Sequence, residues 1–488
     1  MKNLAPVARA SLCALAATAF AVSSYAADKI PITTSSEEAR QLYLKGRDLV
    51  EKLRAADAGP FFEQAAAKDP SFALAQVGLA NSAGTAKEFF AAIAKAVTLG
   101  EKASEPERLL ICSLDAGAKA EPARQTECLT KLVQAVPDDE RAHNQLAQAL
   151  FGRQDYAAAI VEYKKATALN PQFSQPYNQM GYAFRFMGQY PEAEQAFKKY
   201  IELIPGDPNP YDSYAELLMK TGRFEESIKN YEKALAVDPN FVASYIGIGN
   251  DRVFMGQPEE ARKSYAKLAA VARNDGEKLL AHFWTTMSYV HEGATDKAVA
   301  EVEKMAAIDQ AGKDLVALSA AQKQMGDILI EAGRIDEAVK KYQEQVATID
   351  KADAPAQVKE TAHRQALFDE ARVALARHDV AGAKAKAAAY ASAVAAHKVP
   401  FEMRQTHELA GRIALEEKKP GVAVSELAQA NQQDPRVLYL LAVAHQAAGD
   451  PVKAKLAGVQ AADFNGLSNT YGYVRAKAKA MVTAPKKN

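Results

Sequence analysis

The chain has 488 residues, of which 48% are hydrophobic and 25% are charged, with 60 basic and 60 acidic side chains. This neutral balance argues against a nucleic-acid-binding protein, which would present a basic face. The length fits either several ordinary domains or one long repeat array. Alanine dominates the hydrophobic residues and tryptophan occurs once, a composition that favours many packed helices over sheets.

Residues 1–27 have the pattern of a secretory signal peptide. Lys2 and Arg9 precede the apolar run at 12–22, and the following SSYAA suits cleavage near Ala26, with Ala27 as the alternative. The run is too short to cross a bilayer, although an uncleaved anchor stays open. No other segment of the sequence reads as a membrane span, so we expect a periplasmic or secreted protein without a transmembrane segment in the mature chain.

From residue 140 to residue 273 the sequence repeats every 34 residues. Four series of residues keep this interval in register, which makes chance an improbable explanation. The series are the prolines Pro137, Pro171, Pro205 and Pro239, the aromatics Tyr163, Phe197, Tyr231 and Tyr265, and two sets of small residues, Ala147, Gly181, Ala215 and Gly249, and Ala159, Ala193, Ser227 and Ala261.

Each period is predicted to form two helices. In residues 174–205 a first stripe of apolar side chains at helical spacing ends near Phe184. Gly188 supplies a helix stop, and Pro191 a first-turn start for a second helix that carries Phe197. The small residues of the two helices let their backbones approach, and the aromatics fill the space between neighbouring units.

This pattern resembles the tetratricopeptide repeat, a 34-residue helix-turn-helix unit with small residues at fixed sites, an aromatic in the second helix and a closing proline. The resemblance implies an all-α, right-handed superhelical solenoid of about twelve antiparallel helix pairs. We expect an N-terminal array over 28–273, clearest at 140–273, and a degenerate array over 274–482. Residues 468–482 are predicted to form a capping helix, and 483–488 a disordered tail.

The resemblance implies that the first helices of successive units line a concave wall. The side chains predicted to face this groove are Asn144, Gln148, Asn178, Tyr182, Arg185, Asp212, Glu216 and Asn250. Amides can donate to and accept from a peptide backbone, and tyrosine adds contact area, so we expect a peptide or protein partner there. The alternative is a solvated surface with no partner. The paired Lys and Asn with which some relatives grip a terminal carboxylate are absent at these positions, apart from Asn250.

Cys112 and Cys128 lie in the same predicted hairpin. An exported protein meets an oxidising compartment, which favours a disulfide. The repeat frame puts Cys112 at a buried position and Cys128 at a mostly exposed one, so a bridge and two free thiols both stay open.

The sequence shows no catalytic constellation, and we expect neither a metal nor another cofactor. HELAG at His407 resembles the start of a zinc-protease motif, but Gly411 stands where the second histidine would be, in the series of small packing residues. The other histidines show no ligand spacing with Cys or acidic residues, and no phosphate loop or nucleophile elbow occurs. A hydrolase in the irregular stretch 274–400, using His282, Trp284 and His291, is the least favoured hypothesis.

The sequence therefore favours a non-enzymatic interaction scaffold of the bacterial cell envelope, binding an extended peptide or a partner helix in its groove as part of an envelope complex. The alternative is an accessory protein of polysaccharide or peptidoglycan export or assembly.

Overall fold

The computed structural model describes residues 29–466 and 468–483, which form 25 α-helices and no strand. The predicted signal peptide and most of the predicted tail lie outside these residues. The helices of the N-terminal part are α1 (Glu37–Glu51), α2 (Ala55–Lys68), α3 (Ala73–Asn81), α4 (Ala86–Gly100), α5 (Glu105–Ala118), α6 (Pro122–Ala135), α7 (Glu140–Gly152), α8 (Tyr156–Leu169), α9 (Ser174–Phe186), α10 (Tyr190–Leu203), α11 (Asn209–Lys220), α12 (Phe224–Val237), α13 (Val242–Phe254) and α14 (Pro258–Val271). Those of the C-terminal part are α15 (Asp275–Glu292), α16 (Thr295–Ala311), α17 (Leu315–Glu331), α18 (Ile335–Lys351), α19 (Ala356–Ala376), α20 (Val380–His397), α21 (Pro400–Glu416), α22 (Pro420–Leu427), α23 (Pro435–Ala447), α24 (Pro451–Ala462) and α25 (Tyr471–Thr483).

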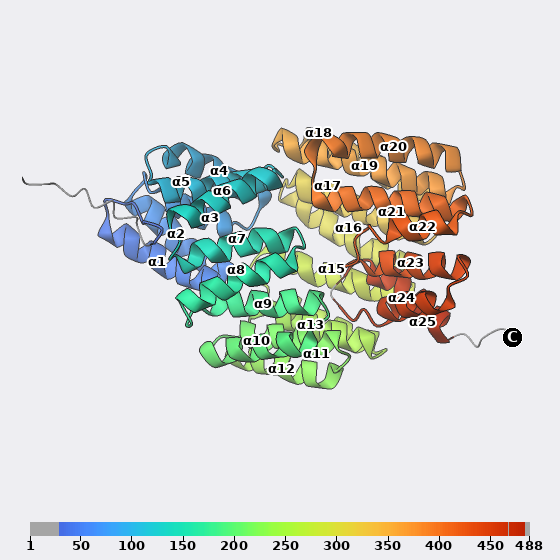
Figure 1. The fold of residues 1–488 in the computed structure, drawn as a ribbon, viewed down its shortest axis with the longest axis horizontal. Helices are drawn as coiled ribbons and strands as arrows, with labels where there is room; N and C mark the ends of the chain where they lie inside the picture. Colours follow the sequence, from blue (N-terminus) through green and yellow to red (C-terminus); the bar gives the residue numbers. More distant parts are fainter. Residues whose placement is uncertain (1–28, 467, 484–488) are drawn as a thin grey trace, which may run out of the picture.

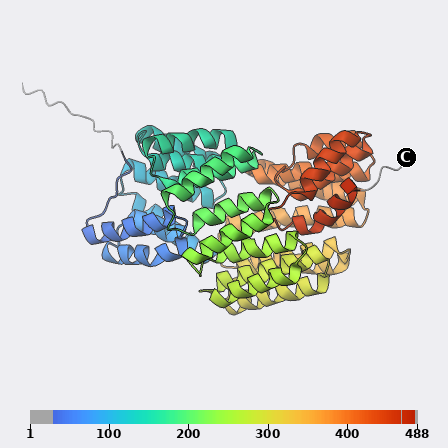
Figure 2. The same ribbon diagram turned by 90° about the horizontal axis from the view of Figure 1, so that it is seen from below.

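Consecutive helices pack in antiparallel pairs, and each pair packs against the next. The predicted all-α solenoid of helix pairs is thus confirmed. Figures 1 and 2 show the path of the stack: α1–α8 form one end, α9–α14 pass through the middle, and α15–α25 turn back to form the other end. The predicted division at residue 273 falls in the loop between α14 and α15, and the two helices pack against each other across it.

The turn inside most pairs contains one residue with a left-handed backbone. Gly188, at φ 75°, follows α9, and the backbone N–H groups of Gly188 and Gln189 donate to the carbonyls of Arg185 and Phe184. These two hydrogen bonds satisfy carbonyl groups that would otherwise have no partner at the end of the helix. Gly222 and Gly256 repeat the geometry one and two periods later, which explains the glycine predicted as a helix stop.

The 34-residue proline series has a hydrogen-bonding role. The hydroxyl groups of Tyr177, Tyr211 and Tyr245 each donate to the carbonyl of the proline six residues earlier, at 3.0–3.4 Å. In the preceding unit Nε2 of His143 lies 2.9 Å from the carbonyl oxygen of Pro137. The same side-chain position therefore ties each first helix to the loop before it.

The small-residue and aromatic series meet inside each pair, whereas the sequence predicts that the aromatics fill the space between neighbouring units. A Cβ placed on Gly181 would come within 2.6 Å of the Phe197 ring, and one on Gly249 within 2.1 Å of the Tyr265 ring. Both rings are fully or almost fully buried. Burying such a side chain contributes roughly 1.5–3 kcal/mol, so these contacts are a main source of stability for each unit.

The C-terminal end of the chain packs back on the middle of the stack. Nη2 of Arg475 on α25 donates to the carbonyl of Phe254 at 2.8 Å, and Tyr471 packs against the rings of Phe254 and His291. Lys220 at the end of α11 donates to the carbonyl of Phe464. The predicted apolar face of the last helix, which carries Tyr471, is therefore buried. The helix packs on α15 as well as on α24.

Candidate partner-binding site

Two large cavities lie on the inner side of the stack. The N-terminal cavity, of about 960 Å³, is lined mainly by the first helices α1, α3, α5, α7 and the start of α9, with further side chains from α6 and the start of α21. The central cavity, of about 1250 Å³, lies between the ends of α7–α11 and the first helices α17, α19, α21 and α23. Phe401 and Gly152 line both cavities, so the two adjoin.

The N-terminal cavity is lined by both apolar and polar side chains. The apolar side chains are Val50, Leu53, Leu74, Val77, Leu110 and Leu114. The polar side chains include Arg47, Gln125, Gln145, Gln148 and Gln175. Such a surface can bury the apolar face of a peptide or helix while amides and a guanidinium meet its polar groups.

Residues 29–36, which we call the N-terminal strap, form an extended segment whose first residues are part of the wall of this cavity. The backbone N–H of Ile30 donates to Oδ2 of Asp139 at 2.7 Å, and that of Thr33 to Oε1 of Glu107 at 2.7 Å. The Thr34 hydroxyl donates to Oδ2 of Asp69 at 2.6 Å. One carboxylate from each of three successive units therefore holds the strap.

Apolar contacts complete this binding mode. Ile30 packs on the cluster that contains Leu129 and Leu132, and Ile32 packs on the cluster that contains Tyr43 and Phe72. Hydrogen bonds from Ser71 and Thr34 lower the pKa of Asp69 to about 2. The N-terminal array thus holds the extended strap by hydrogen bonds to its backbone and by apolar contacts with alternate side chains, Ile30 and Ile32.

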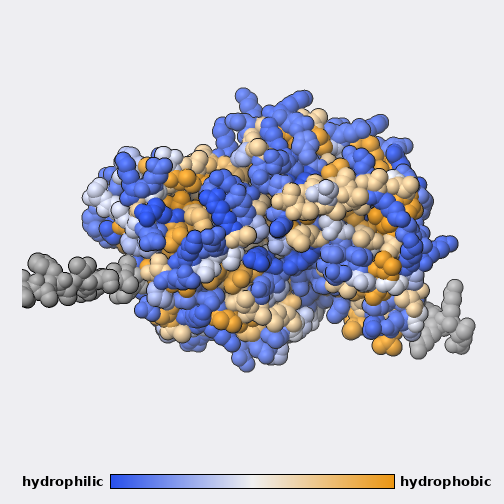
Figure 3. All heavy atoms as spheres, turned by 45° about the horizontal axis from the view of Figure 1, so that its top comes forward, coloured by the Kyte–Doolittle hydropathy of each residue, from blue (hydrophilic) through white to orange (hydrophobic). Residues whose placement is uncertain are grey.

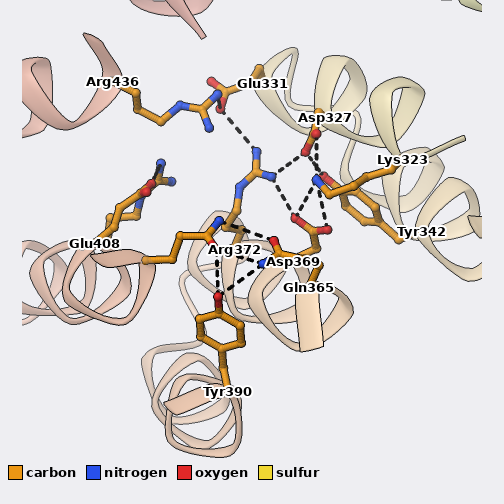
Figure 4. A network of polar contacts seen from close by, with 12 residues as sticks. Lys323, Asp327, Glu331, Tyr342, Gln365, Asp369, Arg372, Tyr390, Glu408 and Arg436 are labelled. Atoms are coloured by element: carbon orange, nitrogen blue, oxygen red, sulfur yellow. Dashed lines mark hydrogen bonds and ion pairs between the residues drawn. The ribbon is translucent and has the colours of Figure 1, made fainter. Parts of the chain in front are cut away.

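The wall of the central cavity carries a network of charged side chains on α17, α19 and α23 (Figure 4). Nη1 of Arg372 lies 2.5 Å from Oδ1 of Asp327 and 3.0 Å from Oδ1 of Asp369. Nζ of Lys323 lies 2.9 Å from Oδ2 of Asp327 and 3.2 Å from Oδ2 of Asp369. These two cations and two carboxylates compensate one another.

The network extends through Glu331 to α23 of a later helix pair. Oε1 of Glu331 lies 2.9 Å from Nη2 of Arg436 and 3.6 Å from Nη2 of Arg372. Burial acts to raise the pKa of Asp327 and of Glu331, but the neighbouring cations outweigh it and lower both pKa values. Both carboxyl groups are therefore held in the charged form.

The row of predicted groove residues is only partly on a cavity wall. Asn144 and Gln148 line the N-terminal cavity, and Arg185 lines the central cavity. Tyr182, Asn178, Asp212, Glu216 and Asn250 line neither of the two.

The expectation of an exposed row is wrong, because neighbouring first helices cover most of these side chains. Their exposure classes are buried for Asn144, Asn178, Asp212 and Asn250 and intermediate for Gln148, Tyr182, Arg185 and Glu216. Many bond within the chain instead: Nη1 of Arg185 lies 3.0 Å from Oε2 of Glu216, and the Ser244 hydroxyl donates to Oδ1 of Asp212 at 2.7 Å. Their role in binding a partner stays a prediction.

Cys112 and Cys128 form a disulfide that joins α5 to α6, with Cα atoms 6.1 Å apart. Cys128 is buried, so the exposed position predicted from the repeat frame is wrong. Ala196, two periods later, is buried as well, so the position is not a uniformly exposed one.

Three histidines have acidic partners that the sequence reading missed. Nδ1 of His143, His282 and His407 lies 2.6, 2.6 and 2.8 Å from a carboxylate oxygen of the glutamate 19 residues later. The spacing joins the first helix of a pair to the second, so these contacts are packing features of the pair. Within the described residues, no group of three or more His, Cys, Asp or Glu side chains is arranged to hold a metal ion.

The surface is mostly hydrophilic on the face that Figure 3 shows. Figure 3 shows hydrophilic residues over much of the visible face, with apolar residues in separate patches. None of the helices built from residues 29–466 and 468–483 has the length and apolar content that crossing a bilayer requires.

Family profiles match three parts of the chain. Profiles described as tetratricopeptide repeat match residues 140–173 and 162–195, and one described as TPR repeat matches 215–250. No curated protein matches the chain. The profiles show that residues 140–195 and 215–250 are tetratricopeptide repeats, and these lie within the longer stack of helix pairs.

Several solved structures are similar to parts or most of the chain. The Cut9–Hcn1 hetero-tetramer of the APC/C is 13% identical, with 89% of this chain and 79% of that one covered and a TM-score of 0.41. MamA from Desulfovibrio magneticus RS-1 is 18% identical over 34% of this chain and 95% of its own, with a TM-score of 0.30. YrrB, described as a TPR protein with an unusual peptide-binding site, is 18% identical over 38% and 94%, with a TM-score of 0.26.

Proposed function

We propose that the protein is a non-enzymatic interaction scaffold of the bacterial cell envelope that holds a polypeptide segment of a partner in its N-terminal cavity. The observation that carries the proposal is the N-terminal strap. The same array already binds one extended segment by carboxylate acceptors and apolar sockets. The cavity beside the strap offers the same chemistry to a second segment.

The partner's segment is expected to be amphipathic. Its apolar side chains would lie against Leu110, Leu114 and Val77, and its polar groups would meet Gln145 and Gln148. Amide side chains both donate and accept, so they serve a peptide backbone as well as polar side chains. The envelope address rests on the signal-peptide pattern of residues 1–27.

The test compares two aspartate substitutions at side chains of similar exposure. Leu53 lines the cavity, is 39% exposed and has a left-handed backbone that Asp tolerates, while Val97 is 41% exposed on α4 and lines neither cavity. Affinity capture from detergent-treated envelopes should recover the same proteins with wild type and V97D, and lose a specific subset with L53D. Identical recovery from L53D and wild type would contradict the proposal.

The address is tested separately. Cell fractionation should place the chain in the periplasm or medium, and sequencing of its N-terminus should begin at Ala27 or Asp28. A cytoplasmic chain that keeps Met1 would contradict the envelope assignment and leave the groove assignment in place.

A further inference from the structure

The central cavity has features of a ligand site that partner binding in the N-terminal cavity does not use. Arg372 is 4% exposed and Arg436 is 9% exposed, and both line the cavity. Nε of Arg436 has no hydrogen-bond partner among the described residues, and Nη2 of Arg372 has none beyond its ion pair with Glu331 at 3.6 Å. A buried N–H group without a partner costs free energy, so these donors favour a ligand that accepts from them.

The ion pairs of the charged network on this wall disfavour a strongly charged ligand there. Arg372 and Lys323 are compensated by Asp327 and Asp369, and Arg436 by Glu331 (Figure 4). A carboxylate or ammonium group on the ligand would have to displace one member of these buried ion pairs, which is costly. A neutral ligand can use the remaining N–H groups and lone pairs without breaking a pair.

Amide and hydroxyl side chains add hydrogen-bond donors and acceptors to the wall of the central cavity. Nε2 of Gln365 donates to Oε1 of Gln405 at 2.8 Å, and the Tyr390 hydroxyl donates to the same oxygen at 2.7 Å, which fixes both amides at the cavity. On another side the Thr470 hydroxyl donates to Oδ1 of Asp434 at 2.6 Å. Held in place in this way, such groups can both donate to and accept from hydroxyl groups.

Aromatic rings line the same cavity. Trp284 is half-buried and stands edge-to-face with Phe283, at a ring-centroid distance of 5.1 Å. Phe401 is 51% exposed although it lies at the cavity wall, and Tyr156 stacks on Phe186 nearby. The exposed ring of Phe401 and the partly exposed rings beside it lie next to fixed polar groups, which suits a ligand with both C–H faces and hydroxyl edges.

We infer that the central cavity binds a neutral oligosaccharide. Sugar rings would stack on the aromatic side chains, and their hydroxyl groups would pair with the free N–H groups of Arg372 and Arg436 and with the amides of Gln365 and Gln405. At about 1250 Å³ the cavity exceeds the space that a single sugar ring needs, which favours a chain of several rings. The inference does not depend on the proposed partner segment.

The chain offers a direct readout, because Trp284 is its single tryptophan. The full mature chain would be titrated with chitotetraose and with maltotetraose while tryptophan fluorescence is followed, and tetraglycine and tetraglutamate would serve as peptide probes. We expect a saturable change with at least one saccharide and none with either peptide. No saccharide response, or a response to a peptide alone, would overturn the inference.

Two substitutions locate the binding. F401A removes an exposed ring at the junction of the two cavities, and M403A changes a side chain of 47% exposure on the same helix that lines neither cavity. The saccharide dissociation constant should rise roughly tenfold in F401A, corresponding to about 1.4 kcal/mol, and stay unchanged in M403A. Equal affinity of F401A and wild type would overturn the site assignment.

A third substitution separates the two proposals. L53D alters the N-terminal cavity alone, so it should leave the saccharide titration unchanged even where it abolishes capture of the protein partner. A parallel loss of saccharide binding in L53D would contradict a separate central site.

Discussion

The regular region α7–α14 and the longer-helix region α15–α21 use the same helix-pair architecture with different chemistry. The helices of the first have 12–14 residues and those of the second 17–21. The first helices of the second region begin at residues 275, 315, 356 and 400, so the interval exceeds 34 residues. About one added turn per helix therefore conceals the repeat in the sequence.

The inner helices differ in how they treat buried polar groups. In α13, Asp251 is fully buried and neither carboxylate oxygen has a hydrogen-bond partner among the described residues. In α17 and α19, Asp327 and Asp369 are compensated by Lys323 and Arg372. A fold can bury a single neutral acid without changing its neighbours. A buried network of charges is stable only when all of its members are present together.

Removing Arg372 should have the largest effect on stability, and it should act on the longer-helix region alone. R372M leaves Asp327, Asp369 and Glu331 without their shared cation, and breaking a buried pair of this kind costs about 3–5 kcal/mol. Hydrogen exchange should show faster opening of α17–α20, with α7–α12 unchanged. Uniform loss of protection along the whole chain would contradict a local network and indicate a single cooperative unit.

The disulfide between α5 and α6 should have the next largest effect. It closes a loop with a sequence separation of 16, for which a loss of about 2–4 kcal/mol is expected on removal. In the double variant C112A/C128A, exchange should accelerate in α3–α7 and stay as in wild type in α17–α23. Mass analysis without reductant provides the control, since two free thiols in the wild-type chain would refute the bridge.

The two buried acids of the regular region should make its stability depend on pH. Burial raises the pKa of Asp251 and of Asp212 to about 8, so between the ordinary Asp pKa and pH 8 the folded state binds more protons than the unfolded state. Stability therefore falls as pH rises through this range, by on the order of 1–3 kcal/mol per group. D251N/D212N should flatten the dependence in urea unfolding followed from pH 5 to 9. A dependence as steep as that of wild type would show that these carboxyl groups are already charged in the fold.

The smallest effect concerns the turn residues. Gly188 and Lys418 occupy equivalent left-handed turns, at φ 75° and 56°, in the two regions. A non-glycine residue costs about 1–2 kcal/mol there, so G188A should destabilise its unit and K418G should stabilise its own by a similar amount. Differential scanning fluorimetry of the two variants would measure both signs, and a stabilised G188A would contradict the turn geometry.

The fold was predictable from the sequence because its signal is periodic. The glycine stops, the closing prolines and the small-to-aromatic contacts such as Gly181 with Phe197 all follow from the 34-residue interval. The groove was less predictable, because exposure depends on how closely neighbouring first helices pack. Asn178 and Asp212 look like surface residues in one helix and are covered by the next.

The central cavity could not be predicted from local pattern at all. Its wall combines residues as distant in sequence as Gln154 and Asn431, whose side-chain amides form a hydrogen bond of 3.1 Å. Only the return of the C-terminal helices onto the middle of the stack brings them together. The N-terminal strap escaped detection for a similar reason, since its partners Asp69, Glu107 and Asp139 lie in three different units.

Site-resolved photocrosslinking in living cells tests the central claim most directly. A photoreactive residue would replace, one at a time, Leu53 and Gln148 in the N-terminal cavity and Val97 and Lys131 on the outer helices α4 and α6. The account predicts that the same partner is captured from both cavity positions and from neither outer position. Capture of that partner from Val97 or Lys131, with none from Leu53 and Gln148, would contradict it.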